Sequence, residues 1–125
     1  MDGRAADKVG TGNYGEGVRH IRLVPGDSEH PEASVAVKPV NGVDGSGWKI
    51  KVAYKKTEEG YNIEAVIPID KQYMPALTMT PGRIIGFDIA VDDADRMDRK
   101  AQIVWRGKVD NNSRPASFGK VRLAK

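Results

Sequence analysis

The chain contains no cysteine, which excludes disulfide bonds, thiolate chemistry and zinc sites built from cysteine. It also has no apolar run approaching the ~20 residues of a membrane-spanning helix. No segment repeats apolar residues with the 3.6-residue period of an amphipathic helix, so the sequence argues against a helical fold. What it does contain is 14 glycines and 7 prolines, which divide the chain into short segments.

Charges of the two signs are nearly balanced, since 20 Lys and Arg against 17 Asp and Glu give a net charge of +3 over 125 residues. The basic residues are interleaved with other residues, whereas nucleic-acid binders more often carry a basic block with aromatic residues between the charges. We therefore expect no nucleic-acid partner. The length suits one domain, and we predict a single domain over residues 1–125 with residues 1–16 irregular.

Apolar and polar residues alternate with a period of two in most segments. Residues 48–54 read Trp-Lys-Ile-Lys-Val-Ala-Tyr, an alternation typical of antiparallel strands that are buried on one face. We predict seven strands, at 17–24, 34–38, 47–55, 60–67, 83–91, 100–106 and 118–124. The third and fourth form the clearest hairpin, through the turn Thr57–Gly60. This pattern favours an all-β fold, an antiparallel β-sandwich of the jelly-roll or immunoglobulin-like type.

Several segments of the second half of the chain follow one another in a characteristic order. They are Gly-Tyr-Asn-Ile-Glu-Ala-Val-Ile-Pro at 60–68, Pro-Gly-Arg-Ile-Ile-Gly-Phe-Asp-Ile at 81–89, an aspartate-rich turn, Trp105, and Phe-Gly-Lys-Val-Arg-Leu at 118–123. This order resembles the family 9 carbohydrate-binding modules, which belong to the DOMON-like β-sandwiches. The resemblance implies a sugar-binding sandwich attached to an exported polysaccharide-degrading enzyme, with structural calcium in some members.

The chain departs from this family at the sugar clamp and at its beginning. Well-known members hold a terminal sugar between two tryptophans, one of them in the loop before the last strand. The corresponding loop, residues 110–117, has no aromatic residue, and no counterpart of the family's opening strands precedes Met1. The clamp is therefore not carried over. A sandwich without those strands has an open sheet edge, through which we predict that two copies pair into a homodimer.

Five polar or aromatic residues are candidates for sugar binding: Arg22, His20, Trp105, Asn111 and Asn112. On the strand at 17–24, Ile21 and Leu23 would face the core, which places His20 and Arg22 on the opposite face. The resemblance implies that this strand contributes polar groups to the sugar site. An arginine suits vicinal hydroxyls because it offers several fixed N–H donors. The alternative for both residues is a solvated sheet face.

The two tryptophans admit two interpretations. A flat indole is a good platform for the apolar face of a sugar ring, and Trp105 ends a strand just before a polar loop. Large aromatic side chains are, however, more often part of a core. Trp48 shares a strand face with Ile50, Val52 and Tyr54, which favours a core position for it. For Trp105 both positions stay open.

Four closely spaced aspartates are candidates for a calcium site: Asp92, Asp93, Asp95 and Asp98. Calcium takes six to eight oxygen ligands, and carboxylates gathered on one turn supply them. The spacing is not that of an EF-hand loop, which needs a glycine at its sixth position and a glutamate at its twelfth. Neutralisation of the aspartates by Arg96, Arg99 and Lys100 is the alternative.

No residue pattern in the chain indicates catalysis. A glycosidase needs two carboxyl groups about 5–10 Å apart across a cleft, and no serine lies in a Gly-x-Ser-x-Gly elbow. We therefore expect a non-catalytic module that binds polysaccharide or oligosaccharide. A degenerate sandwich that serves as an interaction or spacer domain is the alternative. The resemblance implies a secreted or periplasmic protein, but residues 1–4 do not read as a signal peptide, so the signal would lie outside this chain.

Overall fold

The computed structural model describes residues 1–12, 14–95, 98–106, 108 and 112–124. Within these ranges the chain forms eight strands and one short 3-10 helix: β1 Ile21–Val24, β2 Ser34–Val37, β3 Lys51–Lys56, β4 Tyr61–Val66, β5 Ile84–Phe87, β6 Ala90–Asp95, β7 Asp98–Val104, η1 Pro115–Ser117 and β8 Gly119–Arg122. None of the described segments is a helix long and apolar enough to cross a membrane. The predicted all-β fold is confirmed.

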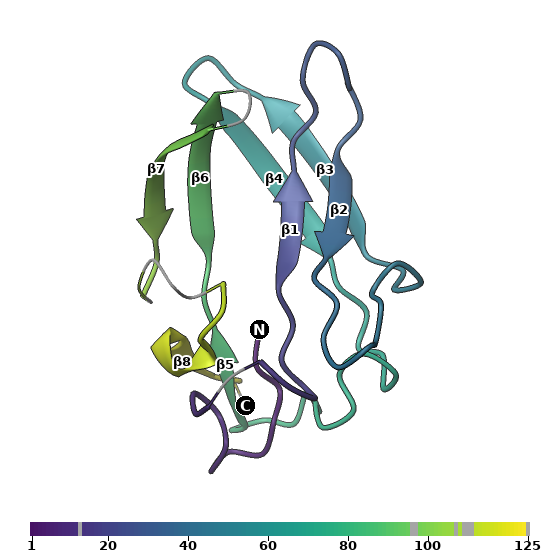
Figure 1. Cartoon of the computed structure of the whole chain (residues 1–125), viewed down its shortest axis with the longest axis vertical. Coiled ribbons are helices and arrows are strands. Elements are labelled where there is room, and N and C mark those ends of the chain that lie inside the picture. The colour runs from purple at the N-terminus through teal and green to yellow at the C-terminus, as the bar shows by residue number, and fades with distance from the viewer. Residues whose placement is uncertain (13, 96–97, 107, 109–111, 125) are drawn as a thin grey trace.

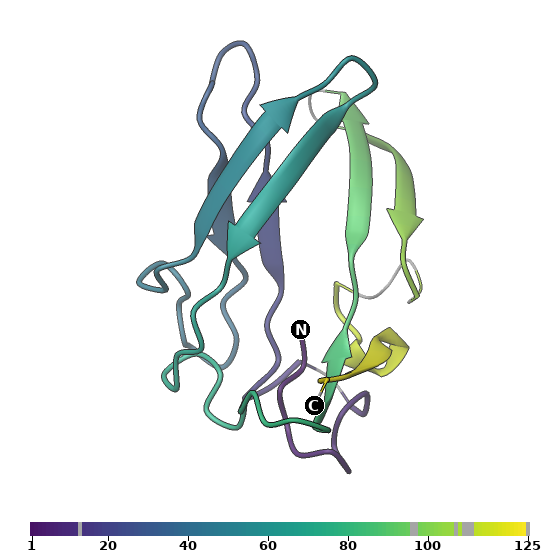
Figure 2. The same cartoon turned by 180° about the vertical axis from the view of Figure 1, so that it is seen from behind.

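The strands pair antiparallel in twos, as β1–β2, β3–β4, β5–β8 and β6–β7. Figure 1 shows β1–β2 and β6–β7 side by side in one layer, with β3–β4 behind them. Figure 2 shows the same arrangement from the other side, where β3 and β4 cross in front. β5 leads into β6 and pairs with β8 at the end of the molecule where both termini lie. The result is a β-sandwich made of small sheets.

The core lies towards this same end, and the connections between strands supply most of it. Its buried members are Trp48, Tyr73, Met74, Leu77 and Ile85. The rings of Trp48 and Tyr73 stack with their centroids 5.2 Å apart, and the indole N–H of Trp48 donates to the Pro68 carbonyl at 2.9 Å. Burial of an indole is favourable when its polar N–H also finds an acceptor. The core position predicted for Trp48, which is 5 % exposed, is confirmed.

The predicted hairpin is β3–β4, in which Tyr54 lies opposite Ile63. The predicted single strand at 83–91 is wrong, because it divides into β5 and β6. At the break, the Asp88 carboxylate accepts hydrogen bonds from its neighbour Ile89 and from the Arg106 N–H, both at 3.0 Å. These contacts of a side chain with the backbone compete with the strand ladder.

The composition of the aspartate-rich segment suggested an open turn. In the structure this segment consists mainly of paired strands. It belongs to the β6–β7 hairpin, whose register is irregular only between Asp93 and Ala94. Aspartate is depleted in strands, but cross-strand pairing overrides that weak preference.

Residues 1–12 contain no strand or helix, yet Asp2 fixes them to the sandwich. Its backbone bridges to Val18 on one side and to Gly86 on the other, with N–H to O distances of 2.7 and 2.9 Å to Gly86. Its fully buried carboxylate accepts hydrogen bonds from the Arg4 guanidinium at 2.8 and 2.9 Å and from the Gly10 N–H at 2.9 Å. The start of the chain therefore lies between the segments that lead into β1 and β6.

Candidate functional site

A polar surface forms around Lys38, just after β2. The backbone N–H of Lys38 donates to the His20 carbonyl at 2.9 Å, and its ammonium donates to the Asn112 carbonyl at 3.3 Å. The same ammonium lies 5.7 Å from the centre of the Tyr14 ring, a distance at which a cation is attracted to an aromatic face. Tyr14 in turn packs edge-on against Phe118, with centroids 6.2 Å apart. We call His20, Lys38, Asn112 and Tyr14 the Lys38 surface.

His20 and Arg22 lie on the strand face that their alternation predicts. Ile21 and Leu23 are partly buried, whereas Arg22 is exposed. Burial lowers the pKa of His20 below its ordinary value, and the positive charges of Lys38 and Arg22 lower it further, while Asp92 acts in the opposite direction. His20 is therefore neutral at pH 7, and its ring can both donate and accept a hydrogen bond.

Trp105 lies on a different surface. The backbone N–H of Trp105 donates to the Ile89 carbonyl at 2.8 Å. This hydrogen bond extends the register of β6 and β7, in which Val91 lies opposite Ile103. Because side chains two residues apart share a sheet face, Trp105 stands with these three apolar residues, and Asp92 stands on the opposite face. All four are exposed, Ile103 by 75 % and Trp105 by 57 %. We call Ile89, Val91, Ile103 and Trp105 the Trp105 strip.

The indole of Trp105 is held from one side. It packs against the Phe87 ring, with centroids 6.3 Å apart. A Cβ at Gly119 would lie 2.7 Å from the Cζ3 atom of Trp105, a separation that real contacts do not reach. The indole thus rests where a glycine leaves room for it, and much of its surface stays in contact with water. A fixed, exposed indole is the feature that sugar stacking requires.

The structure divides the candidate sugar ligands into two groups. His20 and Asn112 both contact Lys38, and Arg22, on β1, lies two residues after His20. Trp105 belongs to the Trp105 strip, which lies on the face of β6–β7 opposite to Asp92. Asn111 lies outside the described residues.

Of the four candidate calcium ligands, the structure describes the side chains of Asp92 and Asp93. Asp92 already accepts hydrogen bonds from the Gln102 amide at 2.6 Å and from the Arg99 guanidinium at 3.5 Å. Asp92 and Asp93 are successive strand residues, so their side chains point to opposite faces. Over the described side chains, which omit those of Asp95 and Asp98, no three acidic or histidine residues are grouped to hold a metal. Calcium binding stays a prediction.

Three residues with prominent contacts or burial in the structure were not among the candidates: Asp2, Lys38 and Arg19. Nothing in the sequence singles out Asp2 or Lys38, because their contacts join segments far apart along the chain. Arg19 did leave a signal. It shares the period-two phase of Ile21 and Leu23, which predicts a core-facing arginine, and it is indeed buried.

The fold and these surfaces define a β-sandwich with an exposed, fixed tryptophan, a class that contains many binding modules. Comparison with protein families makes the assignment specific. Residues 6–125 match the family described as "Carbohydrate family 9 binding domain-like", so the chain belongs to this family. The resemblance noted in the sequence is thereby confirmed.

Two curated relatives carry the name endo-1,4-beta-xylanase A. The one from Thermotoga maritima is 36 % identical over 86 residues, and the one from Thermotoga neapolitana is 33 % identical over 86 residues. Each match covers 67 % of this chain but only 8 % of the relative. The chain thus corresponds to a small part of these relatives. No solved structure matches it.

Proposed function

We propose that the chain is a non-catalytic carbohydrate-binding module and that Trp105 is its principal sugar contact. Membership of the family supports the general function. The exposed indole, held by Phe87 and by the space at Gly119, is the observation that carries the proposed site. Stacking of a sugar ring on this indole buries the apolar C–H groups of the sugar, while neighbouring polar groups take its hydroxyls.

The relatives suggest which polysaccharide to test first. Their names specify action on 1,4-beta-xylan, so we propose a β-1,4-linked plant polysaccharide as the ligand of this chain. A module of this kind acts by tethering a partner domain to its polymer, which raises the local concentration of that domain. The proposal includes a larger, exported carbohydrate-active protein as the natural context.

A second candidate function, an interaction domain without sugar binding, is favoured by the rest of the Trp105 strip. Ile89, Val91 and Ile103 are exposed apolar side chains on one sheet face, and contiguous exposed apolar surface often marks a contact with another protein. A second copy of the chain is the simplest such partner, although a contact between sheet faces would differ from the predicted pairing through an open sheet edge. Sugar binding depends on Trp105, whereas contact with a second copy depends on Ile103.

Electrophoresis in native gels that contain soluble xylan, or other β-1,4-glycans, tests the proposal. We expect the glycan to retard the wild-type chain and Trp105→Ala to migrate as in a gel without glycan. Tyr61→Ala is the matched control, because it removes another exposed aromatic residue, on β4, and should leave retardation unchanged. Equal retardation of wild type and Trp105→Ala would refute the assignment of Trp105. Failure of every glycan to retard the wild type would favour the interaction domain.

A further inference from the structure

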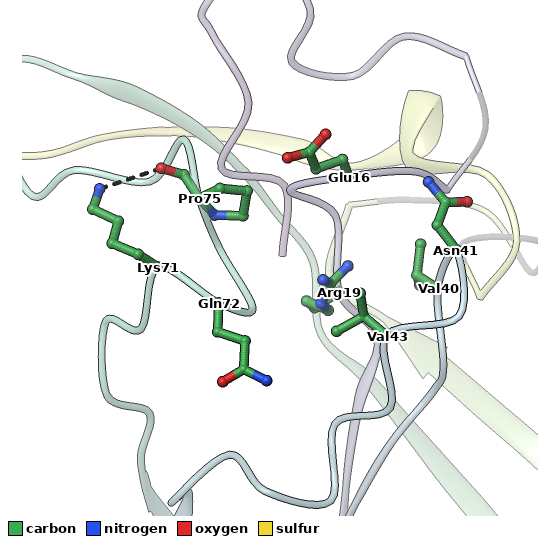
Figure 3. A pocket seen from close by; sticks show the side chains of 8 residues that line it. All are labelled: Glu16, Arg19, Val40, Asn41, Val43, Lys71, Gln72 and Pro75. Atoms are coloured by element: carbon green, nitrogen blue, oxygen red, sulfur yellow. Dashed lines mark hydrogen bonds between the residues drawn. The ribbon is translucent and has the colours of Figure 1, made fainter.

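A cavity of about 290 Å³ lies outside both surfaces described above (Figure 3). Its walls come from the segment before β1, from the turn after β2 and from the connection between β4 and β5. Polar side chains reach it from each of these segments: Glu16, Arg19, Asn41, Lys71 and Gln72. Val43 and Pro75 add apolar surface. The volume lies just below the range of about 300–1,000 Å³ that is typical of small-molecule sites.

Arg19 is the unusual member of this lining. It is only 2 % exposed. One Nη1 hydrogen bond, of 2.9 Å, goes to the Val18 carbonyl, and its buried Nε has no hydrogen-bond partner. The ion pairs found over the described residues do not include Arg19. A buried cation that no carboxylate contacts is costly, and an anion placed beside it would offset much of that cost.

The rest of the lining favours the same kind of ligand. The Lys71 ammonium donates to two carbonyls, those of Leu77 at 2.7 Å and of Pro75 at 3.4 Å, the second of which Figure 3 shows. These neutral acceptors leave its positive charge in place, and Figure 3 shows the ammonium turned toward the Pro75 carbonyl and away from Arg19. Glu16 is the single acidic residue among the lining side chains, and it is exposed to water, which screens its attraction to Arg19.

We propose that this cavity binds the carboxylate of a sugar acid, a hexuronate, with Arg19 as the principal partner of the carboxylate. A planar guanidinium matches a carboxylate in shape and charge. The Asn41 and Gln72 amides suit hydroxyl groups, and Val43 and Pro75 suit the apolar face of a sugar ring. The choice of a sugar acid among small carboxylates rests on the proposed carbohydrate-binding function. The site itself shares no residue with the Trp105 strip.

Isothermal titration calorimetry with glucuronate and galacturonate tests this inference, with glucose and galactose as neutral counterparts. We expect the wild type to bind at least one uronate, with neither neutral sugar approaching that affinity. Arg19→Gln should weaken uronate binding about tenfold or more, the loss expected for one charge-assisted hydrogen bond. Equal affinity for uronate and neutral sugar, or no binding of either uronate, would overturn the proposal.

Glu16→Gln provides a test that does not depend on Arg19→Gln folding. The substitution removes the competing negative charge from an exposed position and should strengthen uronate binding about threefold. Glu58→Gln, in the exposed turn between β3 and β4, is the matched control and should change nothing. Unchanged affinity in Glu16→Gln would contradict the site. Trp105→Ala should keep uronate binding even though it loses retardation by polysaccharide, so failure of either proposal is visible separately.

Discussion

The buried carboxylate of Asp2 should be a main determinant of stability, although it lies at the start of the chain. Replacement by alanine removes the acceptor of the Gly10 N–H and of the Arg4 Nε and Nη2 groups, although Nη2 keeps its 2.8 Å hydrogen bond to the Thr11 carbonyl. Removing one partner of a buried ion pair typically costs about 3–5 kcal/mol. The Arg4 side chain is itself 17 % exposed and can recover some hydration. We therefore expect Asp2→Ala to lower the free energy of unfolding by about 3 kcal/mol, the lower end of that range.

Urea unfolding at pH 7, followed by tryptophan fluorescence, measures this loss. Asp7→Ala is the matched control, because Asp7 is an exposed aspartate of the same segment, and substitutions of this kind usually change stability by less than ~0.5 kcal/mol. A loss below about 1 kcal/mol for Asp2→Ala would refute the view that its hydrogen bonds hold this segment in place. An equal loss in both variants would refute it as well.

The pH dependence of the same difference provides a second check. Burial by itself would raise the pKa of Asp2, but hydrogen bonds from Arg4 and Gly10 outweigh it and hold the pKa below its ordinary value. A depressed carboxyl pKa stabilises the folded state above the ordinary pKa of about 3.9, and the contribution disappears as the pH falls through the folded-state value. The difference in stability between wild type and Asp2→Ala should therefore shrink below about pH 4. A constant difference down to pH 2 would contradict this reasoning.

Three further predictions concern the two surfaces. Gly119→Ala should displace the Trp105 indole, since the new methyl would lie 2.7 Å from it. Retardation in glycan gels should therefore weaken clearly, while the thermal midpoint falls only slightly. The pKa of His20 is lowered mainly by burial, and NMR titration should place it below 6.5. As the pH falls, the histidine of the unfolded chain binds a proton before that of the folded chain. His20 therefore makes the free energy of unfolding fall as the pH drops below 6.5. Light scattering at high concentration should show a dimer in the wild type and more monomer in Ile103→Thr; a monomeric wild type would refute pairing through this strip.

The alternation of apolar and polar residues was sufficient to predict the sandwich and its clearest hairpin, because strand faces follow directly from sequence parity. It also assigned His20 and Arg22 to the face opposite Ile21. The same rule could not show that the acidic segment pairs as a hairpin. That pairing depends on cross-strand contacts such as Gln102 with Asp92, which composition does not reveal.

Parity also explains why the sequence supports two interpretations of Trp105. A period of two identifies which side chains share a face, but it does not tell whether another element covers that face. Trp105 shares its face with apolar residues, as a core position requires, yet this face is largely exposed. For Arg19 the period of two predicts a core-facing side chain, although arginine is rarely found in a core.

Fluorescence of the two tryptophans during titration with β-1,4-xylo-oligosaccharides tests the central proposal most directly. Trp48 is buried beneath Tyr73, whereas Trp105 is exposed, so a sugar that stacks on Trp105 should change its emission and leave that of Trp48 unchanged. We predict a saturable change in the wild type and none in Trp105→Ala, which retains Trp48. The same saturable change in Trp105→Ala, or calorimetric binding with no change in wild-type emission, would contradict Trp105 as the sugar platform.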